Sequence, residues 1–377
     1  MKELRFHGQA IVTGQGSVAY LKTWGIKRAL IVTGGQSAAK NGMLDRVIAI
    51  IREGGGECAV VGGVPKNPPL ETVRDGLKRL AEYQPDTVIG LGGGSAIDVA
   101  KIMALWADNP EADLAAAYRQ GALPQARCRT RLVAIPGTSG TASEVTPFAV
   151  LTFRDENLKR GGKSAGLIPD LAILDVDMTL SMPPHVAAET GMDAMAHAVE
   201  CYTNRALDDF TACLAEGAIE GLYRFLPGSC HTGSRAMREK VHNYQCMAGC
   251  AFANVGTGMD HGIAHAIGGK YDLGHGLVIA VALPYVLEFN SRDSMVRERL
   301  ARLAGRLGVP DYIEAIRRLN AELGIPKSFR ELGISEAAFA ADFDGLVENS
   351  LQGSTRVNPV PVSREDMELI LRRIYNG

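Results

Sequence analysis

The sequence lacks several features that would place it in particular classes of protein. Its 377 residues contain no run of about 18 apolar residues, so no membrane-spanning helix is expected. Its formal net charge is −2, so it has no excess positive charge to hold nucleic acid or an anionic membrane surface. The N-terminal stretch has neither an apolar core nor a small-residue cleavage site, which favours a cytoplasmic location over export.

Cysteine is also sparse, and its arrangement carries information. The seven cysteines are an odd number and include no CxxC pair. This pattern offers no disulfide framework and is typical of reduced thiols in a cytosolic enzyme. The hydrophobic and charged fractions, 46% and 22%, are ordinary for a soluble globular protein. The length favours two domains over one.

The first half of the chain alternates short β-rich runs with helical patterns. The predicted strands are 28–35, 57–64, 86–95 and 131–140, and the predicted helices are 41–55, 69–84 and 96–107. This alternation predicts an α/β domain with a mostly parallel sheet covered on both faces. After residues 170–184 the strand patterns give way to Ala- and Leu-rich helical patterns. We therefore expect a dinucleotide-binding α/β domain over 1–180 and an all-α domain over 181–377.

Two turns that follow predicted strands are candidates for binding phosphate groups. In the first, Gly92, Gly93 and Gly94 precede a predicted helix, and Ser95 is placed to cap that helix. A plain tight turn explains this motif equally well when it is taken alone. The second turn, PGTSGTASEVTP over 136–147, is rich in hydroxyl groups. Ligands of open parallel sheets bind beyond the carboxyl ends of strands, so the two turns together predict a nucleotide site.

The turn after the first predicted strand bears on the choice of cofactor. An acidic residue there would accept hydrogen bonds from a ribose 2′-hydroxyl and repel a 2′-phosphate. The sequence has Gly34 and Gly35 instead, followed by Ser37 and Lys40. These residues leave room for a 2′-phosphate and could bind it, although Lys40 could equally be a solvated residue at a helix start. Taken alone, these residue types leave the choice between NADP(H) and NAD(H) open.

Histidine is rare in this chain, and its distribution predicts a metal site. Of the eight histidines, four lie in two short segments, as His197 in GMDAMAHAVE and as His261, His265 and His275 in DHGIAHAIGGKYDLGHG. Asp193 and His197 are four residues apart in a predicted helix, so their side chains point the same way. A carboxylate with several imidazoles suits a borderline divalent cation such as Fe(II) or Zn(II).

These motifs together resemble those of the iron-containing, or group III, alcohol dehydrogenases. The resemblance covers nearly the whole chain in the same order, from GGGSAIDVAK and PGTSGTASEVT to GMDAMAHAVE, AGCAFANVGTGMDHGIAHAIGG and GHG. It implies four metal ligands, Asp193, His197, His261 and His275. It also implies that His265 lies near the nicotinamide and relays protons. The cofactor-binding residues that it implies, together with those of the turn after the first strand, are Gly34, Gly35, Ser37, Lys40, Asn67, Gly93, Gly94, Ser95, Asp98, Thr138, Thr141 and Lys159.

The chain departs from the family pattern at several positions. Gly137 stands where the family often has Thr, Ala142 where it usually has Gly, and Gly274 where the last ligand is commonly preceded by Pro. None of these changes removes a ligand. Gly34 stands where NAD-preferring members commonly have Asp, and the Gly-rich turn with Ser37 and Lys40 is similar to the NADP-dependent butanol dehydrogenase branch. This resemblance implies a preference for NADP(H) over NAD(H).

The resemblance implies a metal-dependent oxidoreductase that transfers hydride between a nicotinamide cofactor and a small alcohol or aldehyde. The family associates at least as dimers, so a homo-oligomer is expected. One alternative is a metal-independent reductase similar to maleylacetate reductases, which the complete ligand set disfavours. A lyase similar to dehydroquinate synthase would need basic residues for a phosphorylated substrate, and no such cluster lies near the histidines in sequence. A non-catalytic nucleotide-binding protein is the third alternative.

Overall fold

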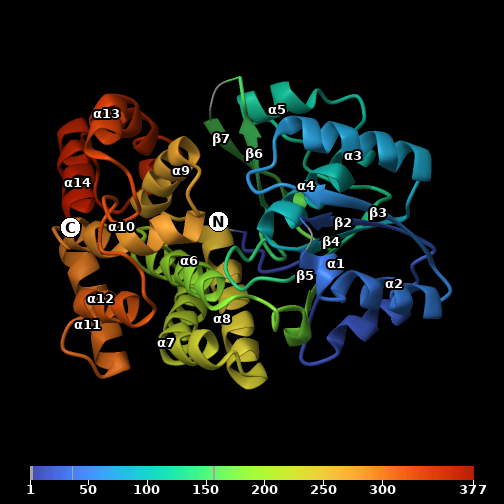
Figure 1. Cartoon of the computed structure of the whole chain (residues 1–377), viewed down its shortest axis with the longest axis horizontal. Helices are drawn as coiled ribbons and strands as arrows, with labels where there is room; N and C mark the ends of the chain where they lie inside the picture. Colours follow the sequence, from blue (N-terminus) through green and yellow to red (C-terminus); the bar gives the residue numbers. More distant parts are fainter. Residues whose placement is uncertain (1–2, 36, 156–157) are drawn as a thin grey trace. The chain divides into compact units, whose positions relative to one another are not determined.

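The chain divides into two compact units, Met1–Met182 and Pro183–Gly377. The structure is a computed structural model and describes residues 3–35, 37–155 and 158–377. Figure 1 shows both units, and each is described by itself below.

The first unit is built around a six-stranded sheet. Its strand order is β1-β8-β5-β4-β2-β3, and every neighbouring pair is parallel. The strands are β1 (Ala10–Thr13), β2 (Arg28–Gly34), β3 (Glu57–Val64), β4 (Thr87–Gly92), β5 (Arg131–Pro136) and β8 (Leu171–Leu174). The predicted α/β domain with a mostly parallel sheet is therefore confirmed.

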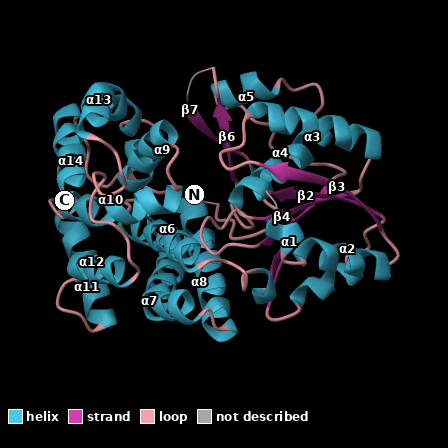
Figure 2. Cartoon of the chain, in the orientation of Figure 1, coloured by secondary structure: helices cyan, strands magenta, loops and turns pink. Residues whose placement is uncertain are grey.

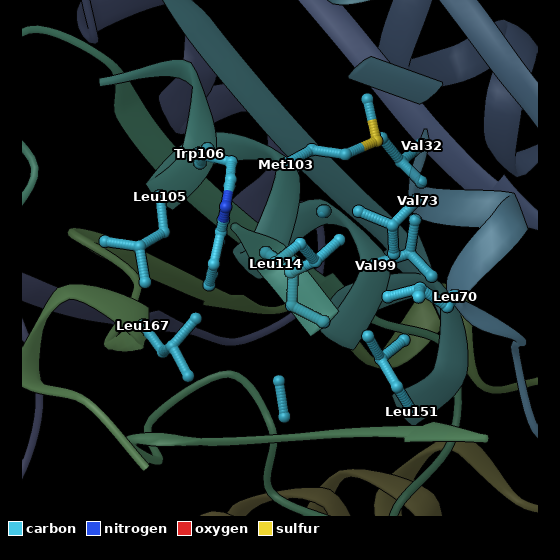
Figure 3. Packing of buried hydrophobic residues seen from close by; sticks show 14 of the residues in the cluster. Val32, Leu70, Val73, Val99, Met103, Leu105, Trp106, Leu114, Leu151 and Leu167 are labelled. Carbon is cyan, nitrogen blue, oxygen red and sulfur yellow. The ribbon is translucent and has the colours of Figure 1, made fainter. Parts of the chain in front are cut away.

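Helices cover both faces of this sheet because its strands are apolar on both sides. Along β2, Leu30 and Val32 belong to one buried cluster, whereas Ala29 and Ile31 belong to another. Successive strand residues point to opposite faces, so the two clusters lie on opposite sides of the sheet. Figure 3 shows part of the first cluster, in which residues of α3 and α4 pack together. The helices of this unit are α1 (Ser37–Lys40), α2 (Met43–Glu53), α3 (Leu70–Tyr83), α4 (Gly94–Ala107), α5 (Leu114–Gln120) and the short 3-10 helices η1 (Ser17–Thr23), η2 (Ala165–Leu167) and η3 (Val176–Met178).

The strand order reverses beside β2. The chain leads from β2 outward to β3 and then returns to β4 on the other side of β2. Because all these strands are parallel, the turns that follow β2, β4 and β5 lie at one edge of the sheet. A reversal of this kind is where open α/β sheets bind their ligands.

A separate antiparallel hairpin accompanies the sheet. It consists of β6 (Phe148–Phe153) and β7 (Leu158–Lys163), which pair from Phe148 with Lys163 to Phe153 with Leu158. The hairpin directly follows the hydroxyl-rich turn, so contacts of β6 also restrain the end of that turn.

The second unit is helical throughout, as predicted. It contains α6 (Pro184–Thr203), α7 (Asp209–Thr232), α8 (Arg235–Val255), α9 (Met259–Tyr271), α10 (His275–Asn290), α11 (Ser294–Leu307), α12 (Tyr312–Glu322), α13 (Glu336–Ser350), η4 (Gly353–Val357) and α14 (Arg364–Asn376). Figure 2 shows helices and loops in this unit, and residues 183–377, all of them described, contain no strand. In the described parts of both units, no helix combines the length and apolar character needed to cross a membrane.

Candidate metal centre and cofactor turns

Helix α6 carries the first two predicted metal ligands. It starts at Pro184, where the missing N–H and fixed φ of proline suit the first helical position. From Gly191 to Thr203 every residue is buried, so this half of the helix is packed on all sides. Asp193 and His197 therefore lie in the interior, with only 3% and 8% of their side chains exposed.

Helices α9 and α10 supply the other two histidines. His261 is in the first turn of α9 and is buried, whereas His275 is the first residue of α10 and is 30% exposed. The glycine after His275 is needed for close approach, because a Cβ on Gly276 would meet the Glu189 carbonyl oxygen at 2.2 Å. The small residue allows the start of α10 to pack directly against α6.

The structure brings three of the four residues tightly together. Ligand atoms of Asp193, His261 and His275 all lie within 4.8 Å of one another. Asp193 Oδ1 is 3.7 Å from His261 Nε2 and 3.9 Å from His275 Nε2. His197 is not part of that group of three, although its Nδ1 lies 3.8 Å from the same oxygen. Its ring stacks on Phe252 at a centroid distance of 4.1 Å.

The interior around these ligands is acidic. Asp193, Glu200 and Asp260 are 2%, 3% and 0% exposed, so three carboxyl groups share this region. Burial raises the pKa of Asp193 to about 6, against the opposing effect of His261. Burial also raises the pKa of Asp260 well above its usual range, with Glu200 and Asp193 adding to the shift. Burial by itself lowers the pKa of His261, but the nearby Glu200 and Asp193 outweigh it and raise the pKa overall. A divalent cation would stabilise such a set of buried carboxyl groups.

Glu200 has a place in the site that the sequence analysis missed. Its Oε2 accepts a hydrogen bond of 2.5 Å from His261 Nδ1, and its Oε1 accepts one of 2.8 Å from the Asp260 backbone N–H. A carboxylate acts only as an acceptor, so it fixes the proton on Nδ1 and leaves Nε2 available as a ligand atom. The available signal was the spacing in GMDAMAHAVE, because Glu200 lies three residues after His197 on the same helix.

We expect Glu200→Gln to weaken metal binding by about 10- to 100-fold, because the amide no longer holds the His261 ring with a charged acceptor. Competition between the protein and a chromophoric chelator for Zn(II) measures the change. Glu216→Gln is a control on α7, since Glu216 accepts a hydrogen bond from Tyr202 outside the ligand set. Equal Zn(II) affinities for wild type and Glu200→Gln would contradict this role.

His265, the predicted proton relay, lies next to the ligand histidines. It is half-buried on α9, and its ring is stacked on that of His275 with centroids 5.1 Å apart. Its ring centroid is 6.5 Å from that of His261. His265 therefore lies beside the predicted metal ligands but is not one of the three residues, Asp193, His261 and His275, that lie closest together.

In the first unit, three predicted turns lie side by side. A Cβ on Gly94 would meet Thr141 at 2.8 Å, and a Cβ on Gly93 would meet Thr138 at 3.7 Å. A Cβ on Gly92 would lie 3.9 Å from the Gly34 nitrogen. The turn after β4 therefore touches both the turn after β5 and the end of β2.

The prediction that Ser95 caps α4 is wrong. The helix begins at Gly94, its N-cap is Gly93, and Ser95 lies within the first turn. No side chain caps this end within the described part of the chain. The cap position is decided by the backbone, since Gly93 is extended at φ −74 and ψ 174. An uncapped helix start keeps its backbone N–H groups available to an anion.

The other predicted cofactor residues lie at the β6–β7 hairpin and in the segment after β2. The backbone oxygen of Asn67 accepts a hydrogen bond from Thr152 Oγ1, and Lys159 pairs with Thr152 across the hairpin, so both lie at β6. Gly35 adopts φ +45, which suits glycine, and Lys40 is exposed at the end of α1. The side chain of Ser37 lies outside the described residues.

Asp98 is engaged within the first unit. Its Oδ1 accepts a hydrogen bond of 2.6 Å from Ser143 Oγ, and its Oδ2 accepts one of 2.9 Å from the Val150 backbone N–H. Burial raises the pKa of Asp98, against the opposing effect of Lys101. These contacts give Asp98 an intramolecular role beside the hydroxyl-rich turn.

Comparison with known proteins decides the family. The model described as Iron-containing alcohol dehydrogenase matches residues 8–176, and the model described as Fe-containing alcohol dehydrogenase family, C-terminal, matches residues 187–375. The chain belongs to the iron-containing alcohol dehydrogenases. It is thus a metal-dependent, NAD(P)-dependent alcohol dehydrogenase, and its family uses iron and a nicotinamide cofactor.

Individual relatives of this iron-containing alcohol dehydrogenase agree with the family. It is 35% identical to the NADPH-dependent butanol dehydrogenase of Clostridium saccharobutylicum, with 97% of this chain and 96% of that protein covered. It is 33% identical to the 1-propanol dehydrogenase PduQ of Salmonella typhimurium, with 97% of each covered. The structure of an iron-containing alcohol dehydrogenase from Thermococcus thioreducens matches with a TM-score of 0.92 and 33% identity over 100% of both chains.

One residue of this dehydrogenase has an unfavourable backbone conformation. Ala142 is buried and adopts φ +49. A side chain in this left-handed region is unfavourable by roughly 1 kcal/mol. We therefore expect Ala142→Gly to stabilise the protein by up to about 1 kcal/mol, with part of the gain lost to unfolded-state entropy. Urea unfolding measures the change, and Ala134→Gly, in the middle of β5, should destabilise instead. Loss of stability in Ala142→Gly would show that the strain is relieved in another way.

Proposed function

We propose that Asp193, His197, His261 and His275 hold an Fe(II) or Zn(II) ion, and that the turns after β2, β4 and β5 bind NADP(H). The second unit would then be the metal-binding domain and the first unit the dinucleotide-binding domain. The enzyme would interconvert small primary or secondary alcohols with their aldehydes or ketones.

The observation that carries the metal assignment is a pair of buried atoms. Asp193 Oδ1 and His261 Nε2 have no hydrogen-bond partner among the described residues, yet they lie 3.7 Å apart in the interior. Buried polar atoms normally have partners, so such a pair requires an explanation. Ligand atoms about 2.1 Å from a tetrahedral ion lie roughly 3.4 Å from each other. The observed spacing of 3.7 to 3.9 Å around Asp193 Oδ1 fits a metal of this size.

The ligand types also fit the metal and its task. One carboxylate and imidazole nitrogens suit Fe(II) or Zn(II) and do not separate them. When bound, such an ion polarises an alcohol or carbonyl oxygen, and the nicotinamide ring carries the hydride. Glu200 orients His261, and His265 is placed beside His275 to exchange a proton with the substrate oxygen, directly or through water.

The cofactor preference rests on the end of β2. Gly34 presents no carboxylate toward the neighbouring turn, and Lys40 is exposed close by in sequence. The uncapped start of α4 offers backbone N–H groups to the pyrophosphate, with Thr138 and Thr141 beside it. The relative from Clostridium saccharobutylicum is named for NADPH, which agrees with this preference.

A homo-oligomer of at least two copies and a cytoplasmic location complete the proposal. The strand β1 forms one edge of the six-stranded sheet, and an edge strand can pair with a second copy. None of the seven cysteines, all of which the structure describes, forms a disulfide, in keeping with a reducing compartment. Light scattering coupled to gel filtration tests the oligomeric state.

The deciding experiment compares NADPH and NADH oxidation with a panel of small aldehydes, on apoprotein reconstituted separately with Fe(II) and Zn(II). Turnover restored by a metal, and faster with NADPH, is the expected result. Turnover that does not depend on a metal would instead indicate a reductase similar to the maleylacetate reductases, which lack metal ligands. Tight nucleotide binding without any turnover would favour a lyase or a binding protein.

A further inference from the structure

A fully buried lysine lies close to the cofactor turns in the first unit. Lys101 is on α4, and its side chain is 0% exposed. Lysine is almost never fully buried unless its charge is compensated. Here its Nζ donates to four oxygens, namely those of the Ser143 backbone (2.8 Å), Ser143 Oγ (3.1 Å), Thr146 Oγ1 (3.3 Å) and the Phe148 backbone (2.5 Å).

All four acceptors belong to the segment that leaves the hydroxyl-rich turn. Ser143 follows Thr141 by two residues, and Phe148 is the first residue of β6. Asp98 holds the same segment, through Ser143 Oγ and the Val150 N–H. Residues 143–150 are thereby fixed to α4 by two charged side chains of that helix.

The other end of the turn is fixed to the glycine turn. The Gly137 N–H donates to the Gly92 carbonyl oxygen at 2.8 Å, and Thr141 is packed so closely on Gly94 that a Cβ there would lie 2.8 Å away. The placement of Thr138 and Thr141 beside the start of α4 thus depends on anchors at both ends of the turn. At the second end Lys101 contacts four oxygens and Asp98 accepts two hydrogen bonds.

We propose that Lys101 is a positioning residue for the nicotinamide cofactor, because it holds the turn of Thr138 and Thr141 in place beside the start of α4. This inference rests on the proposed function, in which these turns bind the cofactor phosphates. Lys101 is below the surface and acts through the turn. Its removal should weaken cofactor binding and leave the chemical step at the metal centre nearly unchanged.

The charge on Lys101 makes this anchor sensitive to pH. Asp98 on α4, Glu144 in the turn and Arg127 before β5 are the charged groups that act on it. Burial lowers the pKa of Lys101 to about 8, against the opposing effects of Asp98 and Glu144. An ammonium group has three N–H donors for the four oxygens, whereas the neutral amine has two. Cofactor affinity should therefore fall as the pH rises above about 8.

The test measures the Kd of NADPH by fluorescence titration from pH 6.5 to 9.5, and kcat and KM on metal-loaded enzyme. For Lys101→Met we expect a Kd at pH 7 that is roughly 10- to 100-fold higher, with kcat changed less than about threefold. The wild-type Kd should rise above pH 8, and that rise should be absent in the variant. Lys78→Met, which changes an exposed lysine on α3, is the matched control.

Two further variants keep the outcomes distinct. If Lys101→Met does not fold, Ser143→Ala removes the Oγ atom that accepts from Lys101 and donates to Asp98, and it should raise the Kd by a smaller factor. Gly94→Val tests the proposed function, since its side chain would collide with Thr141 at the cofactor turn. If Gly94→Val binds NADPH like wild type, the cofactor site itself is misplaced. If Gly94→Val loses binding while Lys101→Met or Ser143→Ala retains the wild-type Kd and pH profile, the role of Lys101 is overturned.

Discussion

His261→Ala should lose both bound metal and at least about 10³-fold in turnover. His261 Nε2 is buried 3.7 Å from Asp193 Oδ1, so its removal takes one ligand and leaves Asp193 in an acidic interior with fewer compensating groups. Loss of the ion removes a stabilisation of the developing oxygen charge worth several kcal/mol, which corresponds to roughly a thousandfold in rate. Metal content by mass spectrometry and aldehyde reduction by NADPH, measured on the same preparation, check both parts.

A matched variant separates this loss from general damage. His231 is an exposed histidine of the same unit that lies 3.8 Å from Glu322, far along the chain from the ligands. His231→Ala should keep full metal content and turnover. Full activity in metal-free His261→Ala would overturn the metal-dependent mechanism, and metal retained at wild-type affinity would remove His261 from the ligand set.

The fold could be predicted from the sequence wherever the local residue pattern and the burial in the folded protein agree. The apolar runs of β2, β4 and β5 alternate with helices and are buried almost throughout, and such runs can be buried only in a sheet that is covered on both faces. Strand β7 gave no such signal, since LKRGGK contains three basic residues and two glycines. Its strand conformation depends on pairing with β6, and that pairing depends on tertiary context.

The same distinction explains which site residues the sequence indicated. Asp193 and His197 could be paired because helical spacing places them on one face. The helical spacing after His197 could have indicated Glu200, but its partner His261 lies 61 residues away, and Lys101 acts on Ser143, 42 residues away. No local pattern identifies these partners. Serine is a common N-cap residue, but the backbone becomes helical directly after Gly93, so Gly93 and not Ser95 is the N-cap.

Replacing Gly34 by Asp should reverse the cofactor preference from NADPH to NADH. Gly34 ends β2 beside the glycine turn, and its φ lies outside the left-handed region that excludes side chains. A Cβ would lie 3.3 Å from the Val64 carbonyl oxygen and 3.7 Å from Ala96, so a side chain fits with a small shift. A carboxylate there would accept hydrogen bonds from a ribose 2′-hydroxyl and repel a 2′-phosphate.

The size of the reversal follows from the charge. Placing the Asp carboxylate beside the 2′-phosphate of NADPH brings two negative charges together and costs several kcal/mol. The ratio of kcat/KM for NADPH to that for NADH should therefore fall by roughly 100- to 1000-fold. Gly34→Asn is the matched control, because it has the same shape without the charge and should lower both values of kcat/KM by similar factors. Equal ratios in the Asp and Asn variants would mean that Gly34 provides only space. If neither variant changed the ratio, the 2′-phosphate would not bind at the end of β2. The proposed role of Lys40 would then also be wrong.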